Sequence, residues 1–402
     1  GVGSCSRLCL SARGLRGRKT WGNRSVTPRF VMASKCFFSG MIQSVIRKGL
    51  VRSNRWRLSM GQYIGLDVSL KDTAISIRED GKRIWRGKCP SDPGIIAQAV
   101  RKHADDPLSV VFETGPLATW FFHALTGEGL RAICIEARHA QKILGETLNK
   151  TDANDAEGLA KLAETGFYKA VRVKSFEAML IRSLVAARTQ LLAITTQLTN
   201  QIRGLMKTFG LVVPKSKGRV FIEKVNDLLD GHVELKGIIY PLLEAWQAVR
   251  ERASTLSRQL LLAARQCQST RLLMTIPGVG AITAVSYVAA IEDPKNFPKS
   301  RSVGAWLGLT TRRYQSGEMD FNGHISRRGD QRLRGLLYEA ATSLLTRTRA
   351  ETVSDLKTWG LQLRERLGFK RAAVAVARKL AVIIHSMLKS GQTFVPTREG
   401  LA

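Results

Sequence analysis

The chain has 402 residues, of which 44% are hydrophobic, and 63 lysines and arginines against 32 aspartates and glutamates give a net charge of +31. This length accommodates two or three domains with their own cores, and no uninterrupted apolar run approaches the roughly 18 residues of a membrane span. The six cysteines lack the spacing of a zinc site and are expected to be reduced thiols of a cytosolic protein. So large a positive excess favours nucleic acid as the partner over a membrane surface.

Residues 1–59 form a compositionally distinct segment, with 13 basic and no acidic residues and no sustained periodicity. The composition resembles that of an organelle transit peptide, but Met60 directly precedes a clean strand pattern, which favours translated upstream sequence or a misplaced start over a targeting signal. We predict that this basic extension is disordered. The remaining chain is still basic, with 50 basic against 32 acidic residues and a net charge of +18.

Residues 60–174 are predicted to form an α/β domain with a mixed sheet. Three antiparallel strands are expected first, with Gly81 in the turn before the third. Helices and strands alternate after them. The expected strands cover residues 63–67, 73–78, 82–88, 109–112 and 131–135, and the expected helices cover residues 93–103 and 117–125.

Four acidic residues of this domain are candidate metal ligands. Asp67 and Glu113 end two apolar strands, where carboxylates are costly unless they bind something. Asp152 and Asp155 begin a helix, and their spacing places both on one side of it. That pair alone is explained more simply as a cap with a first-turn acid, with Thr151 or Asp152 as the capping residue. Four oxygen donors nevertheless suit Mg²⁺ or Mn²⁺ acting on a phosphodiester.

Residues 175–268 are predicted to form a helical linker. Apolar residues alternate in steps of four and three over residues 175–209 and 241–266, which is the pattern of a coiled coil. An antiparallel helical hairpin and an intermolecular coiled coil both satisfy this pattern, and an ordinary helical bundle within the monomer is the alternative. A connector rich in lysine and glycine lies between the two runs, at residues 214–219.

Residues 269–402 are predicted to form a third, mainly helical domain. Gly278 and Gly280 lie in a tight turn before an apolar helix over residues 281–291, a helix-hairpin-helix-like arrangement. Its backbone amides could approach a DNA phosphate, although a turn without a ligand is equally compatible. A polar loop containing Ser316 and an amphipathic helix over residues 369–388 follow.

Ser316 is surrounded in sequence by arginines that are candidates for binding nucleic acid. A Ser-Gly pair alone usually marks a turn, but guanidinium groups nearby could stabilise charge on a phosphate. A serine nucleophile also needs an activating group; His324 is the nearest histidine and is explained more simply as a solvent-exposed loop residue. The arginines are Arg312, Arg313, Arg327, Arg328, Arg332 and Arg334.

Six short segments together resemble the DEDD transposases of the Piv-type insertion-sequence family, the group of bridge-RNA-guided recombinases. Their order and spacing make the resemblance specific. One departure is Thr311, where the family commonly has a proline that would stiffen the loop. The segments are Tyr-Ile-Gly-Leu-Asp at 63–67, Val-Phe-Glu-Thr-Gly at 111–115, Asn-Lys-Thr-Asp-Ala-Asn-Asp-Ala at 149–156, Ile-Pro-Gly-Val-Gly at 276–280, Tyr-Gln-Ser-Gly at 314–317 and Ile-Ser-Arg-Arg-Gly-Asp at 325–330.

The resemblance implies a RuvC-like domain of ribonuclease-H type, a coiled-coil insert and a C-terminal transposase domain. It assigns the metal-binding tetrad to Asp67, Glu113, Asp152 and Asp155, and the nucleophile, which forms a covalent phosphoserine link with DNA, to Ser316. It further implies a dimer or tetramer with composite active sites, a noncoding guide RNA that pairs with donor and target DNA, and a place in the bacterial cytoplasm, on the nucleoid when bound.

Two other functions compete with a recombinase. A metal-dependent, structure-specific endonuclease of the Holliday-junction-resolvase type would use water as the nucleophile, and Ser316 would then be incidental. A nucleic-acid-binding scaffold would use its acids only for capping and solubility. Loss of strand transfer with retained cutting in Ser316→Ala would favour the nuclease. Unchanged Mg²⁺ affinity in Asp67→Ala and Asp155→Ala would favour the scaffold.

Overall fold

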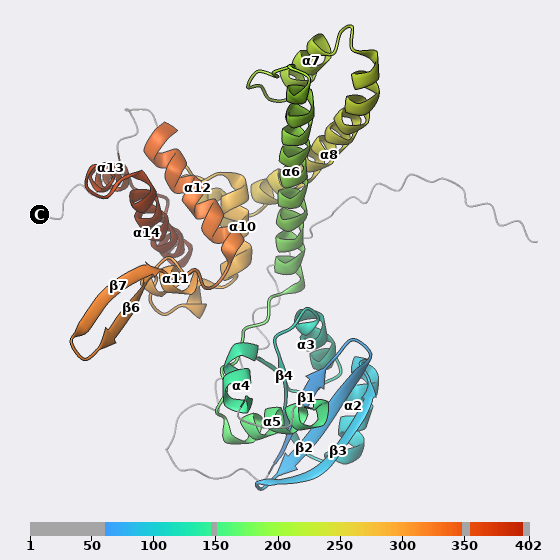
Figure 1. Ribbon diagram of the computed structural model, residues 1–402. Helices are drawn as coiled ribbons and strands as arrows, with labels where there is room; N and C mark the ends of the chain where they lie inside the picture. The colour runs from blue at the N-terminus through green and yellow to red at the C-terminus, as the bar shows by residue number, and fades with distance from the viewer. Residues whose placement is uncertain (1–60, 146–150, 348–353, 397–402) are drawn as a thin grey trace, which may run out of the picture. The chain divides into compact units, whose positions relative to one another are not determined.

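The computed structural model describes residues 61–145, 151–347 and 354–396 (Figure 1). The predicted disordered extension, residues 1–59, lies outside these residues. The described chain combines one mixed α/β sheet with a mainly helical remainder. This confirms the predicted fold class of α/β plus α at the level of its layers.

Five strands form the N-terminal sheet, in the order β3-β2-β1-β4-β5. The first three strands are antiparallel neighbours, whereas β4 and β5 run parallel to β1. Asp80 and Gly81, both with positive φ, make the tight turn between β2 and β3, while helix α3 connects the parallel strands β4 and β5. The strands are β1 Gln62–Val68, β2 Asp72–Glu79, β3 Lys82–Pro90, β4 Pro107–Glu113 and β5 Ala132–Ile135.

Helices cover both faces of this sheet. On one face Ile64 of β1 packs with Ile96 of α2 and Phe121 of α3. On the other face Val111 of β4 packs with Leu159 of α5. Neighbouring residues of a strand point to opposite faces, which is why these apolar strands supply two cores. The helices are α2 Pro93–His103, α3 Ala118–Gly127, α4 Ala137–Leu144 and α5 Asp152–Thr165.

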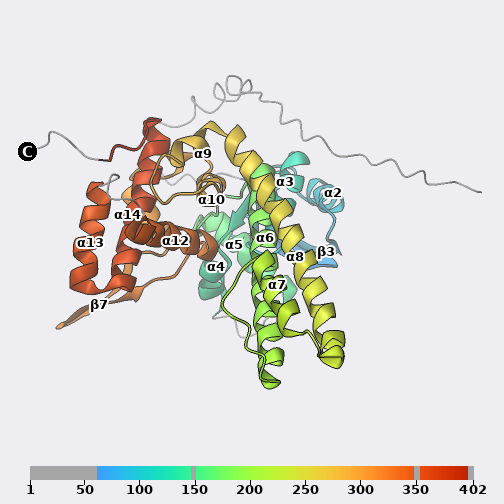
Figure 2. The same ribbon diagram turned by 90° about the horizontal axis from the view of Figure 1, so that it is seen from above.

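Two long helices, α6 Phe176–Thr208 and α8 Val233–Gln266, lie side by side in both views (Figures 1 and 2). Trp246 Nε1 donates to Thr199 Oγ1 at 2.8 Å, and Arg188 Nε donates to Ser257 Oγ at 2.8 Å. The lower-numbered residue of α6 contacts the higher-numbered residue of α8, so the two helices run antiparallel within one chain. Helix α7 Arg219–Leu228, which the sequence did not predict, adds Phe221 to the apolar contacts between them.

Helix α6 is, among the described helices, the one that meets the length and hydropathy of a membrane span. Length and composition alone are weak grounds for such a span. Thr199 and Arg188 instead hydrogen-bond to α8, as expected for one arm of a helical hairpin.

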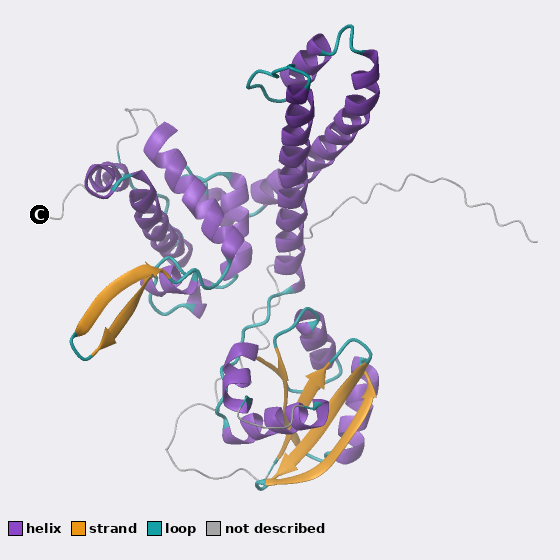
Figure 3. Ribbon diagram, in the orientation of Figure 1, coloured by secondary structure: helices purple, strands orange, loops and turns teal. Residues whose placement is uncertain are grey.

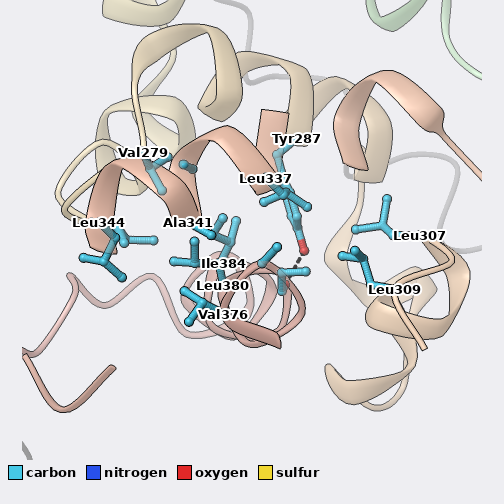
Figure 4. Close-up of a cluster of buried hydrophobic side chains, with 14 of the residues drawn as sticks. Val279, Tyr287, Leu307, Leu309, Leu337, Ala341, Leu344, Val376, Leu380 and Ile384 are labelled. Carbon is cyan, nitrogen blue, oxygen red and sulfur yellow. Dashed lines mark hydrogen bonds between the residues drawn. The ribbon is translucent and has the colours of Figure 1, made fainter. Parts of the chain in front are cut away.

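The C-terminal helices share one core, drawn in Figure 4. Leu337 of α12 and Leu380 of α14 are fully buried in it. Tyr287 of α10 is also buried, and its hydroxyl donates to the Ala381 carbonyl at 2.6 Å, so the polar atom is satisfied. The elements are α9 Gln268–Leu273, α10 Ala281–Ile291, the 3₁₀ helix η1 Pro294–Asn296, α11 Arg301–Trp306, β6 Thr311–Ser316, β7 Met319–Ile325, α12 Gln331–Arg347, α13 Asp355–Leu367 and α14 Phe369–Ser390.

The predicted polar loop around Ser316 is a β-hairpin. Strands β6 and β7 pair in antiparallel fashion, with Ser316 opposite Met319 and a two-residue turn between them (Figure 3). Gly317, the first turn residue, has φ +55, a conformation that favours glycine. The expectation of a loop was therefore wrong.

Candidate active site

Asp67 and Glu113 lie at the carboxyl ends of adjacent strands. Leu66 of β1 is in parallel register with Phe112 of β4, so the next residue of each strand is one of the two acids. Both residues already take part in interactions within the protein. A cavity of about 730 Å³ opens beside them, lined in part by Glu113 and Val68. The two acids thus end neighbouring parallel strands at the same side of the sheet.

Helix α5 brings the other two acids to this domain. Thr151 caps the helix, accepting a hydrogen bond from the Asn154 amide at 3.3 Å, and Asp152 and Asp155 lie in the first turn. The helix crosses β1 at Gly65. A Cβ atom there would lie 2.1 Å from the Ala156 carbonyl oxygen, so only glycine permits this approach.

A buried ion-pair group fixes α5 against strand β2. The Arg78 guanidinium pairs with Glu157 and, at 2.7 Å, with Glu164. Ser76 donates to the same Glu157 carboxylate at 2.5 Å. Burial alone would lower the pKa of Arg78, but the two carboxylates outweigh it and raise that pKa. Glu157 and Glu164 therefore serve to hold α5 in place through their ion pairs with Arg78.

This docking points the N-terminus of α5 toward the edge that carries Asp67. Ala74 of β2 is in register with Asp67. Ala74 also lines a cavity of about 650 Å³ together with Asp152 and Lys88. The Lys88 ammonium lies 3.4 Å from Asp152 Oδ2 and 3.7 Å from Asp72 Oδ2. The sheet edge near Asp67 therefore contains a cation as well as acids.

The described residues contain no group of three or more histidine, cysteine, aspartate or glutamate side chains arranged to hold a metal ion. The four predicted acids thus share a domain and converge on one edge by their elements, but their carboxylates are not gathered into a ligand cluster. Their oxygen donors still match the preference of Mg²⁺ and Mn²⁺.

Ser316 is the last residue of β6 and is exposed. Every other residue of β6 is exposed as well, and β7 is exposed except at Gly323 and Ile325, which are half-buried. The hydroxyl is thus presented at the end of a hairpin, next to the Gly317 turn. The side chain of Ser316 is therefore open to solvent.

Residues 64–210 match a family described as transposase, and residues 270–356 match the transposase IS116/IS110/IS902 family. The probable family 20 transposase of Pseudomonas aeruginosa is 30% identical over 254 residues, which cover 62% of this chain and 75% of that protein. The chain belongs to the IS110/IS116/IS902 family of DEDD transposases.

Other relatives agree with this assignment. The transposase for insertion sequence element IS1111A of Coxiella burnetii is 29% identical over 362 residues, which cover 88% of this chain and 97% of the relative. A putative transposase of Sinorhizobium fredii is 33% identical over 249 residues, 61% of this chain and 64% of the relative. The suspected family resemblance is confirmed, and DNA is the substrate that membership implies.

The predicted arginines of the transposase have different surroundings. Arg313 is paired with Asp320 through two contacts of 2.8 and 2.5 Å, and the pair raises the pKa of Arg313 and lowers that of Asp320. Arg334 donates to the carbonyls of Leu307 and Arg328, each at 2.9 Å, so it fastens the loop before α12. Arg312, Arg327, Arg328 and Arg332 are exposed and, within the described chain, form no ion pair.

The glycine turn of the transposase has a packing role. Gly278 has φ +86, and a Cβ atom there would lie 2.6 Å from the Ala340 carbonyl oxygen of α12. Gly280 is exposed, immediately before α10, with nothing near its missing Cβ. Close contact with α12 therefore explains Gly278 without DNA, while phosphate binding at either glycine stays a prediction.

His324 is too distant to activate Ser316 within its own hairpin. Ser316 lies opposite Met319, five residues before His324 along β7, which is about 17 Å in an extended strand. Sequence reasoning also missed Lys88 and Arg78. Each contacts an acid more than sixty residues away, and no local pattern signals such a pairing.

Proposed function

We propose that this transposase cleaves and exchanges DNA strands through Ser316. Its Oγ attacks a phosphodiester, an Oγ–P bond forms, the bond between phosphorus and the leaving oxygen breaks, and that oxygen takes up a proton. The observation that carries the proposal is the exposure of Ser316 at the end of the β6–β7 hairpin. A hydroxyl at a projecting end can meet a phosphate of duplex DNA, which is too wide for an enclosed pocket.

The exposed arginines would hold phosphates that flank the cleaved one. Arg312 lies four residues before Ser316 on an extended strand, about 13 Å away along the backbone. Arg327 and Arg328 follow the other end of the hairpin. Arg313 contributes less because Asp320 neutralises its charge. These distances favour a role in positioning DNA over direct stabilisation of the reacting phosphate.

The carboxylates of Asp67, Glu113, Asp152 and Asp155 would hold Mg²⁺ or Mn²⁺. The chemistry of the donor set and the shared sheet edge fit such an ion, as does the family. When bound, it would supply charge stabilisation for phosphodiester chemistry. Within the chain, Lys88 balances Asp152, and Arg78 holds the helix that presents the pair.

A composite site accounts for the lack of an activating group beside Ser316. The described part of the hairpin offers no histidine within reach of that hydroxyl, so a second protomer in a dimer or tetramer would bring its acidic domain to the serine. A noncoding guide RNA would select the donor and target DNA, which relieves the protein of reading bases. The family resemblance supports both points.

The test is a denaturing gel of labelled donor DNA incubated with the protein, its RNA and Mg²⁺. Wild type, Ser316→Ala and Asp67→Ala are compared, with Ser302→Ala as a control in a helix outside the hairpin. We expect a protease-sensitive protein–DNA adduct in wild type and in the control. Both site variants should lack it.

Two outcomes would overturn parts of this proposal. Free cut ends without an adduct, formed equally by Ser316→Ala, would identify a metal-dependent nuclease that uses water. An adduct that persists in Asp67→Ala would remove the acidic site from the serine reaction.

A further inference from the structure

A cavity of about 940 Å³ lies between helix α14 and the base of the β6–β7 hairpin. It is lined by six cationic side chains and by no aspartate or glutamate. We call this cavity the α14 groove. Its cations are Arg301, Arg327, Lys370, Arg371, Arg378 and Lys379.

Helix α14 divides its side chains between this groove and the core. Ala373, Ala377 and Leu380 are buried, whereas Arg371 and Arg378, seven residues apart, are exposed. Two helical turns separate these arginines by about 10 Å. Residues needed only for folding would not require a cationic stripe at this spacing.

The lining of the groove holds no carboxylate that could balance its six cations. The cations of the described salt bridges lie outside the groove, and Asp355 lines a neighbouring cavity together with Lys379. Val374 and Ala375 lie between the charged positions and also line the groove. Their small side chains leave the floor open, so an extended polyanion can approach the helix.

We propose that the α14 groove binds the backbone of duplex DNA beside the hairpin that carries Ser316. This rests on the proposed DNA-cleaving function. Cations about 10 Å apart span roughly three base pairs of duplex at about 3.4 Å per pair on each strand. Gly323 and Ile325 of β7 line the same groove, so a duplex held there lies against the base of the β6–β7 hairpin. Five of the six cations were not among the predicted nucleic-acid-binding residues.

The test measures binding of the full chain to a labelled DNA duplex by fluorescence anisotropy, in EDTA, over a range of salt concentrations. Arg371→Gln with Arg378→Gln is compared with Lys295→Gln and Arg366→Gln, a control pair that removes two exposed positive charges outside the groove. We expect the groove variant to weaken binding about 10- to 100-fold, or about three- to tenfold for each of two solvent-exposed contacts. The slope of log affinity against log salt should shrink by about 0.9 per lost phosphate contact.

Equal losses of DNA affinity in the groove and control variants would overturn the proposal. An RNA duplex of the same sequence is titrated in parallel, and a loss of affinity confined to the RNA duplex would also overturn it. Lys370→Gln with Lys379→Gln is a second groove variant, so a folding defect in the first does not decide the result. Binding measured in EDTA depends neither on a metal ion nor on cleavage by Ser316. The binding test can therefore refute the groove proposal while the proposed serine reaction stands, and the cleavage gel can refute the serine reaction while the groove proposal stands.

Discussion

Gly65 shows how one missing side chain positions the helix that carries Asp152 and Asp155. Its Cα faces the backbone of α5, where a Cβ would lie 2.1 Å from the Ala156 oxygen. Gly65→Ala should push α5 away from β1 and lower the free energy of unfolding by about 1–3 kcal/mol. DNA cleavage should fall more steeply than stability, because Asp152 and Asp155 move with the helix.

Chemical denaturation and the cleavage gel check this prediction. Gly127→Ala is the matched control, since it lies in a helix with nothing near the added methyl group. A Gly65→Ala protein as stable and as active as the control would show that α5 does not need this contact.

His385 makes the C-terminal core sensitive to acid. The ring is fully buried, with Nδ1 2.9 Å from Ser300 Oγ and Nε2 3.0 Å from the Pro294 carbonyl oxygen. Burial lowers the pKa of His385 below its ordinary value. The unfolded chain therefore binds a proton more readily, and acidification favours unfolding.

The stability that neutral His385 contributes should be complete above pH about 6.5 and lost as the pH falls toward its lower folded pKa. Thermal unfolding of wild type and His385→Gln across this range isolates the effect. The variant should be less stable by about 1–3 kcal/mol at pH 8, and the gap should narrow in acid. A constant gap would mean that the pKa of His385 is the same in the folded and the unfolded chain.

The positions of Asp67 and Glu113 were predictable from sequence, because parallel strands end at one edge of a sheet. The contacts of Asp152 with Lys88 and of Glu157 with Arg78 were not. They depend on how strands β2 and β3 pack against helix α5 in three dimensions, which hydrophobic periodicity does not record.

At the scale of elements, periodicity predicted the long helices and missed the hairpin. The leucine spacing of α6 and α8 is regular enough to reveal both. Strand β6 consists of exposed residues, and its Arg313–Asp320 contact joins two polar side chains across the hairpin. A strand with no buried face lacks the apolar alternation by which strands are recognised.

Two leucines of α6 differ in their burial within the helical hairpin. Leu198 packs against the core shared with α7 and α8, whereas Leu192 is 39% exposed. Leu198→Asp should lower the free energy of unfolding by about 2–4 kcal/mol because a charge enters this apolar contact. Leu192→Asp is the matched control and should leave stability nearly unchanged.

Denaturation curves compare these variants, and equal curves would place Leu198 outside the core. The predicted dimer or tetramer is a separate matter, because the antiparallel pairing is already satisfied within one chain. Light scattering of Leu192→Asp, which alters an exposed apolar position, tests that assembly without unfolding the hairpin.

For the whole molecule, charge should govern binding. Residues 60–402 carry a net charge of +18 without the basic extension. A chain that starts at Met60 should therefore still bind duplex DNA with affinity that falls steeply with salt, and should retain recombination. Anisotropy titrations and the cleavage gel provide the comparison with the full chain. A flat salt response would refute an electrostatic interaction, and lost recombination would give residues 1–59 a role.

The exposed β6–β7 hairpin bears on how unwanted DNA cleavage is avoided. A two-stranded ribbon is at best marginally stable by itself in water, and β6 and the outer part of β7 bury no side chain in the described protein. On the proposed mechanism, the reactive hydroxyl is then aimed by the DNA that the ribbon meets, more than by the protein. Without bound DNA, the Ser316 hydroxyl would not be held in position for attack. Stray cuts in the host chromosome would then be avoided until a complete assembly forms.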